Sequence, residues 1–467
     1  MKVCLVYPDI GGVEHYGARK FYHGLGYISS VLKAAGHDTA LLYLQAEPTA
    51  EAFLQQISSL APSVVAFSAT THQFPYVAKC ARWIKDALPG IWTIVGGAHP
   101  TLVPEEVAGA PGVDVICVGE GEYPMLDWVN ALQEGKDVAH ISNLWLRQTP
   151  GDTWVRNPLR PLMANLDGLP FADRELFGFD QILARNDGWV DLMAGRGCPY
   201  GCSYCCNPGL RDRFKGLGKY VRFRSVENVL SEIHSLAGRY VIKTLNFQDD
   251  VFTLDRDWTL QFCQEYAKQF SFPFWINTRV ERINDEEMVV ALARAGCRGV
   301  RIGIESGNEK LRAEILKRRM SNDEIRQAFA LADKHGLNVY TCNMLGVPGE
   351  TADMIEETIA LNRELQPADL QFSVFYPYPM TELYDLCVRE GYLGQGESLD
   401  SYYERKSILH LPTLTSEELG REYDQFQQLK TELKMKRESA LRYRVLRLVG
   451  RIKQRLASPS ASPRSEK

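Results

Sequence analysis

Short apolar runs alternate with amphipathic segments through the first third of the chain. Five runs rich in β-branched residues are separated by stretches whose apolar residues recur at helical spacing. The runs are KVCLVYP (2–8), DTALLYL (38–44), SVVAFSA (63–69), WTIVGG (92–97) and VDVICVG (113–119). Continuous apolar strands between helices predict a parallel sheet covered on both faces. We therefore expect a doubly wound, Rossmann- or flavodoxin-like α/β domain over 1–135, with its ligand beyond the carboxyl ends of the strands.

A second alternation begins near residue 188. Its strand candidates are 189–194, 242–247, 272–278, 299–305, 338–345 and 370–376, with helix-like segments between them. Six βα units are too few for a closed eight-stranded barrel, but they fit an open, partial one. We expect a partial (β/α)6 TIM-like barrel over 188–384, with its chemistry at the carboxyl ends of the strands.

The remaining segments are less regular. Residues 136–187 are rich in proline and predict a linker with a small hairpin around 143–157. A helical C-terminal region is expected over 385–456, and the composition of 457–467 predicts a disordered tail.

Charge and composition narrow the class of protein. The 467-residue chain has a net charge of −5, which gives no electrostatic reason to expect nucleic acid as a partner. The opening MKVCLVYP resembles a strand rather than a secretory signal, and no apolar stretch approaches the length of a membrane span. Seven scattered cysteines are typical of reduced thiols. These features predict a cytoplasmic protein.

Residues 434–456 form a basic segment in which Leu441, Val445 and Leu448 recur at helical spacing. Two interpretations stay open. The segment is either an amphipathic helix that contacts an anionic membrane peripherally, or a terminal helix that packs on the protein with a solvated basic face. The first interpretation would favour a lipid-like substrate.

The stretch GRGCPYGCSYCCNP (195–208) carries the strongest chemical signal. Cys198, Cys202 and Cys205 have the spacing C-x-x-x-C-x-x-C, and Cys206 follows directly. Structural zinc usually takes four ligands in two spaced pairs, and no second pair follows here. Three thiolates on an iron–sulfur cluster would leave one iron without a protein ligand. The spacing therefore favours such a cluster, with Cys206 as the cysteine that does not bind it.

This loop, with the aromatic Tyr204 just before the third cysteine, resembles that of the radical S-adenosylmethionine (SAM) enzymes. The resemblance implies a 4Fe–4S cluster held by Cys198, Cys202 and Cys205, with SAM on the open iron. One electron, from a donor such as flavodoxin or ferredoxin, would then cleave SAM to a 5′-deoxyadenosyl radical.

Segments at the ends of the later strands resemble the SAM-binding segments of the same family. They are FQDDVF (247–252), NTRV (277–280), GIESGN (303–308) and MLGVPGET (344–351). Each alone fits a helix cap or a surface ion pair, but together they occur in the family's order on successive strands. The SAM contacts that the resemblance implies are Tyr204, Asp249, Asp250, Arg279, Glu305, Ser306, Gly346 and Pro348.

The N-terminal domain has glycine-rich turns after its fourth and fifth strands, VGGAHPT (95–101) and VGEGE (118–122). Together with 23–38 and 67–73, they resemble the cobalamin-binding domain fused to one branch of the radical SAM family. The resemblance implies a corrinoid between the two domains. The implied cobalamin contacts are Ser68, Thr70, Gly96, Gly97, His99, Gly119, Glu120 and Gly121.

One feature departs from many cobalamin domains, which carry D-x-H-x-x-G after the first strand. Here Asp9 is not followed by histidine at that spacing, and His15 does not precede glycine at the required position. We therefore expect no bond between a protein histidine and cobalt, and we place His99 in the wall of the pocket for the nucleotide tail.

The resemblance implies a methyltransferase that acts on an unactivated carbon of a small-molecule or lipid-like metabolite through the adenosyl radical and methylcobalamin. Two alternatives stay open. One is a cobalamin-dependent oxidative cyclisation or rearrangement without methyl transfer, and the other is a non-catalytic cobalamin-sensing module. A transfer-RNA-modifying enzyme is disfavoured, because no RNA-binding appendage follows the barrel.

Overall fold

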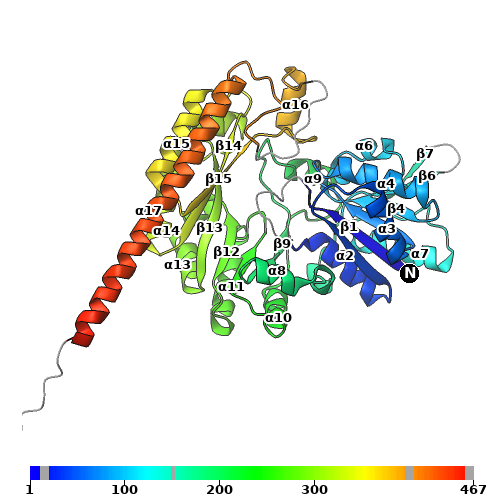
Figure 1. Cartoon of the computed structure of the whole chain (residues 1–467), viewed down its shortest axis with the longest axis horizontal. Helices are drawn as coiled ribbons and strands as arrows, with labels where there is room; N and C mark the ends of the chain where they lie inside the picture. The colour runs from blue at the N-terminus through cyan, green and yellow to red at the C-terminus, as the bar shows by residue number, and fades with distance from the viewer. Residues whose placement is uncertain (11–19, 149–152, 395–403, 458–467) are drawn as a thin grey trace, which may run out of the picture.

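The computed structural model describes residues 1–10, 20–148, 153–394 and 404–457, with side chains up to residue 439. Two α/β domains lie side by side, and a long C-terminal helix runs along the outer side of the second (Figure 1). His15 and the tail 458–467 lie outside the described residues.

The N-terminal sheet has seven strands in the order β2-β1-β3-β4-β5-β6-β7. Its first five strands are parallel: β1 (Lys2–Pro8), β2 (Asp38–Leu44), β3 (Val64–Ser68), β4 (Trp92–Gly96) and β5 (Val115–Cys117). The hairpin expected between the domains forms as β6 (Leu144–Gln148) and β7 (Thr153–Arg156). It pairs antiparallel with β5 and so belongs to this sheet, where it covers a strand edge that would otherwise be open.

Both faces of this sheet are covered, which explains why its strands are apolar throughout. Val3 and Leu5 of β1 pack toward α2 (His23–Ala34) and α7 (Glu122–Glu134), whereas Cys4 and Val6 pack toward α3 (Ala50–Leu60) and α4 (Phe74–Ala87). Two short helices, α5 (Ala98–Leu102) and α6 (Pro104–Gly109), follow β4. The strand order reverses between β1 and β3, and ligands of doubly wound sheets bind at such a point.

The connection to the second domain contains η1 (Leu166–Gly168), η2 (Glu175–Phe177) and α8 (Phe179–Arg185). Phe177 and Phe179 pack in one hydrophobic core that runs from the α2 face of the first sheet to Val190 in the second. The two domains therefore share buried apolar contacts.

The second domain is an open barrel of six parallel strands in the order β15-β14-β13-β12-β11-β8. The strands are β8 (Trp189–Leu192), β11 (Thr244–Phe247), β12 (Phe274–Thr278), β13 (Cys297–Glu305), β14 (Asn338–Leu345) and β15 (Asp369–Val374). The helices of this domain are α10 (Val226–Ala237), α11 (Arg256–Gln269), α12 (Val280–Ile283), α13 (Glu286–Arg294), the π-helical η3 (Leu311–Ile315), α14 (Asn322–Lys334) and α15 (Ala352–Leu365). The side chains of Ser225, Asp255, Asp285, Ser321 and Thr351 cap α10, α11, α13, α14 and α15, and each such cap contributes about 1 kcal/mol.

Two short elements flank the four-cysteine stretch. The strand β9 (Gly195–Arg196) pairs antiparallel with β10 (Arg222–Phe223), and α9 (Asn207–Arg213) begins directly after Cys206. The barrel strand β8, the β9 strand and α9 therefore hold the cysteine loop at the carboxyl end of the barrel.

The C-terminal region contains α16 (Glu382–Arg389) and α17 (Ser416–Ala457). Leu419, Phe426, Leu429 and Leu433 of α17 pack against Ile355 and its neighbours on α15 and β15. The first half of α17 thus packs on the protein, while the side chains of 440–456, which carry most of the basic segment, lie outside the described residues. Among the described helices, none has the length and apolar character needed to cross a membrane.

Candidate functional site

A cavity of about 1020 Å³ opens at the carboxyl ends of the barrel strands. It brings together eight of the residues predicted from the sequence: Cys198, Cys202, Tyr204, Cys205, Asp249, Asp250, Arg279 and Glu305. Cys206 is not among the lining residues. The structure therefore gathers the three spaced cysteines and most of the expected SAM contacts around one space.

Backbone geometry determines the path of the cysteine loop. Gly197 has a φ of +87°, and a Cβ there would lie 2.6 Å from the carbonyl oxygen of Tyr220, so only glycine fits. Farther along, the Ser203 hydroxyl donates to the Ile315 carbonyl at 2.5 Å, and the Ser203 amide donates to the Leu316 carbonyl at 3.3 Å. The loop is thus anchored on both sides before any cofactor binds.

The sulfur atoms are surrounded by hydrogen-bond donors. The Asn207 backbone and side-chain amides donate to Cys205 Sγ at 3.5 and 3.6 Å, and Nη1 of Arg279 lies 3.5 Å from Cys202 Sγ. Nη1 of Arg318 also reaches Cys202 Sγ, at 3.8 Å. Such donors stabilise thiolates and the negative charge of an iron–sulfur cluster. The donor set therefore fits a cluster held by the three spaced cysteines.

The thiols differ in their acidity. A hydrogen bond from the Cys206 thiol, assisted by the Asn207 amides, lowers the pKa of Cys205 to about 6, whereas burial raises that of Cys198 to about 11. Within the described ranges, no three histidine, cysteine or acidic side chains converge on a single metal ion. Each thiolate of an iron–sulfur cluster binds a different iron, so these cysteines do not need to converge on one point.

The two adjacent aspartates have different environments. Asp249 is buried, and its carboxylate accepts hydrogen bonds from the amides of Ala194 at 3.1 Å and Gly195 at 2.5 Å, although burial raises its pKa to about 7. Asp250 is exposed in the cavity and accepts from the Asn207 side chain at 3.3 Å. Asp249 therefore holds the turn between β8 and β9, and Asp250 is the carboxylate that is available to an ammonium group.

Glu305 lies at the end of β13 with a φ of +68°, a conformation that is strained for glutamate. Its carboxylate accepts from the Tyr204 hydroxyl at 2.9 Å and lies 3.9 Å from Nη1 of Arg318. A Cβ on Gly303 would lie 1.9 Å from Oε1 of this carboxylate, so a larger residue at 303 would displace the Glu305 carboxylate. The strained backbone thus turns Glu305 into the cavity, beside the cysteine loop.

The sequence analysis missed Arg318. This residue lies between η3 and α14 rather than at a strand end, and Nη2 donates to the Gly303 carbonyl at 2.6 Å. Its segment, KRRM (317–320), has the composition of a solvated run of charges. In the folded chain this loop packs against the cysteine stretch, so Arg318 is only 5% exposed and faces the cavity. The sequence of the segment alone does not indicate this.

Three expected SAM contacts lie outside the cavity wall: Ser306, Gly346 and Pro348. After the turn at Glu305, Ser306 is fully buried, and its hydroxyl accepts from the Asn308 amide at 3.2 Å. Gly346 faces Leu419 of α17, and its amide donates to Glu350 Oε2 at 2.6 Å. The chain turns away from the cavity beyond both strand ends, so a motif match at these positions does not place the residues in its wall.

The buried side chain of Glu350 accepts hydrogen bonds within the loop that follows β14, and its titration makes the stability of the protein depend on pH. Burial raises its pKa from 4.5 to about 8, and its Oε2 accepts from the Gly346 and Val347 amides. In the unfolded chain the Glu350 carboxyl loses its proton near pH 4.5, whereas in the folded chain it does so only near pH 8. Between these two pH values ionisation favours the unfolded chain, so the free energy of unfolding decreases as the pH rises. The total loss is on the order of 5 kcal/mol.

We expect Glu350→Gln to remove this part of the pH dependence, because the amide keeps the acceptor oxygen but cannot ionise. The thermal midpoint of the variant, relative to that of the wild-type enzyme, should rise steadily between pH 5 and pH 8.5. A constant difference between the two midpoints over that range would contradict the prediction.

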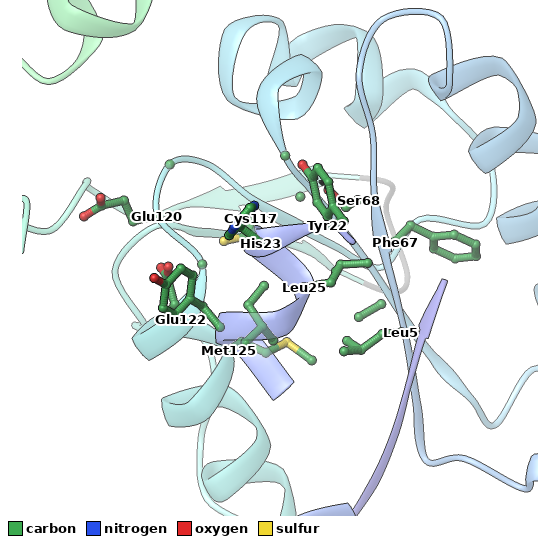
Figure 2. Close-up of a pocket in the computed structure, with 18 of the residues that line it drawn as sticks. Leu5, Tyr22, His23, Leu25, Phe67, Ser68, Cys117, Glu120, Glu122 and Met125 are labelled. Carbon is green, nitrogen blue, oxygen red and sulfur yellow. Dashed lines mark hydrogen bonds between the residues drawn. The ribbon is translucent and has the colours of Figure 1, made fainter. Parts of the chain in front are cut away.

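A second cavity, of about 360 Å³, lies at the carboxyl edge of the N-terminal sheet (Figure 2). Its floor is apolar, with Leu5, Leu25, Phe67 and Met125 among the lining residues. The expected cobalamin contacts that line it are Ser68, Gly96, Gly97, Gly119, Glu120 and Gly121. An apolar floor with a glycine rim fits a flat heterocyclic base such as the one on the nucleotide tail of cobalamin.

Two expected cobalamin contacts do not reach this cavity. His99 is 2% exposed, and its ring stacks on Phe74, with ring centroids 4.6 Å apart, on the sheet face that α4 covers. Thr70 is exposed beyond the end of β3. The short helix α5 carries His99 to the face opposite α2 and α7, so His99 does not line this cavity, and its contact with cobalamin stays a prediction. Asp9, the aspartate that follows β1 without the histidine of the D-x-H-x-x-G motif, accepts a hydrogen bond from the Tyr43 hydroxyl at 2.6 Å.

The two cavities are neighbours. Tyr22 and His23, at the start of α2, line both of them. The ring of His23 is buried, and burial lowers its pKa to about 4, so the imidazole is neutral near pH 7. A ligand in the sheet cavity and a ligand in the barrel cavity would therefore both lie against these two side chains.

An ion-pair network joins the turn that follows β5 in the first domain, residues 118–122, to the cysteine loop of the second. Glu120 pairs with Arg196 at 2.8 Å and with Arg222 at 2.9 Å, and Arg196 also pairs with Glu122 at 2.6 Å. Glu120 is directed away from the other labelled side chains in Figure 2. Its carboxylate is thus engaged by Arg196 and Arg222, and Arg196 precedes Cys198 by two residues.

Comparison with known proteins agrees with this geometry. Residues 192–361 match the Radical SAM superfamily, and residues 21–128 match the B12 binding domain. The chain is 29% identical over 427 residues to the uncharacterized methyltransferase PH0819 of Pyrococcus horikoshii, covering 90% of each chain. It is 26% identical to the anaerobic magnesium-protoporphyrin IX monomethyl ester cyclase of Rubrivivax gelatinosus, covering 82% of this chain and 69% of the cyclase.

Among solved structures, the chain resembles the radical SAM methyltransferase TsrM from Kitasatospora setae, in a complex with tryptophan substrate and a SAM analogue. The TM-score is 0.68 and the identity 19%, with 83% of this chain and 76% of TsrM covered. At that identity the similarity concerns the fold.

Proposed function

This chain belongs to the cobalamin-dependent radical SAM enzymes, in which a B12-binding domain is fused to a radical SAM domain, and we propose that it is a methyltransferase. Its cofactors are a 4Fe–4S cluster, SAM and cobalamin, and the family requires a one-electron reductant. The proposed reaction is the methylation of an unactivated carbon of a small-molecule or lipid-like metabolite.

The main support for this proposal is that the sheet cavity and the barrel cavity adjoin one another. When bound, the cluster with SAM supplies a radical that removes hydrogen, and cobalamin supplies a transferable methyl group. Tyr22 and His23 line both cavities, so a corrinoid with its nucleotide tail in the sheet cavity would extend toward the barrel cavity, where a bound substrate would lie near both reacting groups. Positioning of this kind accounts for a large part of the rate acceleration in reactions of two bound partners.

The protein's own groups have distinct proposed tasks on the SAM side. Cys198, Cys202 and Cys205 hold the cluster, and Arg279, which lies beside Cys202, pairs with the SAM carboxylate. Asp250 accepts from the SAM ammonium group, and Glu305, oriented by Tyr204, accepts from the ribose hydroxyls.

On the cobalamin side, we propose that the Gly97 and Gly119 turns let the nucleotide tail approach the backbone closely. Both have positive φ, +106° and +99°, and a Cβ at either would lie 2.8 Å from its nearest neighbour. Arg196, through Glu120 and Glu122, keeps this turn in register with the cluster loop.

The experiment that tests the proposal uses SAM labelled on its methyl group. We expect the anaerobically reconstituted enzyme, with reductant and an extract of the producing organism, to transfer label to one acceptor and to form 5′-deoxyadenosine. The Cys202→Ala variant should do neither, which controls for chemistry independent of the cluster.

A second candidate is a cyclisation or rearrangement without methyl transfer, which the similarity to the magnesium-protoporphyrin cyclase over 82% of this chain favours. Formation of 5′-deoxyadenosine with a consumed substrate that carries no label would support this candidate and exclude the methyltransferase. A lack of 5′-deoxyadenosine with every extract would favour a cobalamin-sensing module instead.

A further inference from the structure

A belt of polar side chains lies inside the barrel, below the residues assigned to the cluster and SAM. Asp191 on β8, Asn246 on β11 and Arg301 on β13 all line the large cavity. Arg301 precedes Glu305 by four residues on the same strand, which places it about 13 Å deeper in the barrel. Arg301 is therefore separate from Arg279 and Arg318, which lie beside Cys202 at the barrel mouth.

Among the described residues, no carboxylate forms a direct ion pair with Arg301, although the negative charge of Asp191 acts on it from a distance. Its Nη1 donates to Asn246 Oδ1 at 2.7 Å, and its guanidinium lies 5.4 Å from the ring centroid of Trp275. Arg301 is half-buried, and desolvation lowers the pKa of its guanidinium, because the nearby negative charge of Asp191 offsets only part of the lost hydration.

The nearest acidic group in the belt is already bonded elsewhere. Asp191 Oδ1 accepts from the Asn246 amide at 2.6 Å and from the Gln248 amide at 3.0 Å. Asn246 thus lies between the two charged groups: its side-chain NH2 donates to Asp191, and its side-chain oxygen accepts from Arg301. The arrangement orients Arg301 while leaving its other N–H groups to the cavity.

The surroundings of Arg301 are also polar. Tyr340 on β14 donates to Gln371 on β15 at 3.4 Å, and both line the cavity with Cys342. A hydrocarbon ligand at this depth would remove water from these groups without replacing its hydrogen bonds, which costs free energy at each of them. A ligand with anionic oxygen atoms would instead form a direct ion pair with Arg301.

We propose that Arg301 binds an anionic oxygen group, a carboxylate or a phosphate, on the molecule that this enzyme modifies. Arg301 is then a specificity-determining residue that anchors the substrate from below, while the reacting atom faces the barrel mouth. The inference rests on the proposed function, because it assigns the barrel cavity to the substrate. The same chemistry occurs on a water-soluble metabolite and on the anionic head group of a lipid.

The test separates aqueous and lipid extracts of the producing organism by anion exchange. Holoenzyme with methyl-labelled SAM and reductant is then assayed on the retained and unretained fractions of each extract. We expect label only in a retained fraction, and the extract that contains it identifies the source of the anion. Label only in unretained fractions would overturn the proposal.

Variants of Arg301 supply the second readout. Arg301→Gln should raise the amount of the active fraction needed for half-maximal rate by about tenfold or more, with a much smaller change in maximal rate. Arg301→Lys, which keeps the charge, should recover part of the loss. Arg256→Gln is the matched control, because Arg256 pairs with Asp285 on the outside of the same domain. Unchanged half-saturation in Arg301→Gln would also overturn the proposal.

Binding without turnover distinguishes this inference from the proposed function. With SAM omitted, mass spectrometry measures which extract compounds the holoenzyme retains. Anions that the wild-type enzyme retains and Arg301→Gln does not retain would support the role of Arg301. This holds even if no label is transferred in the other assays, because that result would reject only the proposed methyltransferase activity. Equal retention by the wild-type enzyme and the variant would contradict the role of Arg301.

Discussion

Alanine at Cys198, Cys202 or Cys205 is expected to abolish both cluster assembly and turnover, whereas Cys206→Ala is expected to retain the cluster. The three spaced cysteines line the barrel cavity, and Cys206 does not. Instead, Cys206 directly precedes α9, whose first residue, Asn207, donates to Cys205 Sγ through its backbone amide. A cluster with two thiolates loses an iron ligand, and Cys206 is not placed to replace it because its side chain does not line the cavity.

Iron content, the visible absorbance of the cluster and its electron paramagnetic resonance after reduction measure this prediction. Cys206→Ala is the matched control, because it removes a thiol of the same loop. Its cluster should keep its iron, with a shifted signal, because the thiol of Cys206 hydrogen-bonds to Cys205. If iron is lost from Cys206→Ala but kept by Cys205→Ala, the assignment of the third ligand is wrong.

The second large effect is expected at Gly97, where alanine should prevent the retention of cobalamin. Gly97 has a φ of +106°, and a Cβ there would lie 2.8 Å from the Ala69 carbonyl oxygen and 2.9 Å from the Ala69 amide nitrogen. The strained backbone alone costs about 1–2 kcal/mol. The Ala69 amide, which donates to the Gly96 carbonyl at 2.9 Å, must also move, and the cavity rim moves with it.

Cobalamin retained through purification, and its affinity measured by absorbance titration, test this expectation. We expect at least a tenfold weaker affinity, equivalent to about 1.4 kcal/mol, with an unchanged iron content. Gly109→Ala is the control, since Gly109 ends α6 without a positive φ and a Cβ there meets no atom within 4 Å. Wild-type affinity in Gly97→Ala would show that the turn does not contact the cofactor.

The secondary structure was predictable where apolar residues follow one another in a short run or recur at helical spacing. The strand prediction 338–345 coincides with β14, and 2–8 coincides with β1, because each is a short run rich in strand-forming residues that is bounded by turn residues. The hairpin at 143–157 was also predictable as a hairpin. Its membership of the first sheet was not, because β5 and β6 are joined only by hydrogen bonds between distant segments.

The site was predictable only in part. Residues whose role follows from local spacing, such as the three cysteines and Tyr204, lie where the motif predicts. Ser306 and His99 belong to matching segments, yet the chain turns both side chains away from the cavities. Glu120 does reach its cavity, but its carboxylate is engaged by Arg196 and Arg222 from the other domain.

By itself, therefore, the sequence determined two α/β domains, the family resemblance and the cysteines that could hold a cluster, because these depend on periodicity and spacing within a few residues. Tertiary structure alone decided that Arg318 faces the cysteine loop, that Arg301 lies inside the barrel with no direct ion pair to a described carboxylate, and that Tyr22 and His23 line two adjoining cavities. These features depend on the burial of charge and on contacts between residues far apart in the chain, and neither property is encoded in a local pattern.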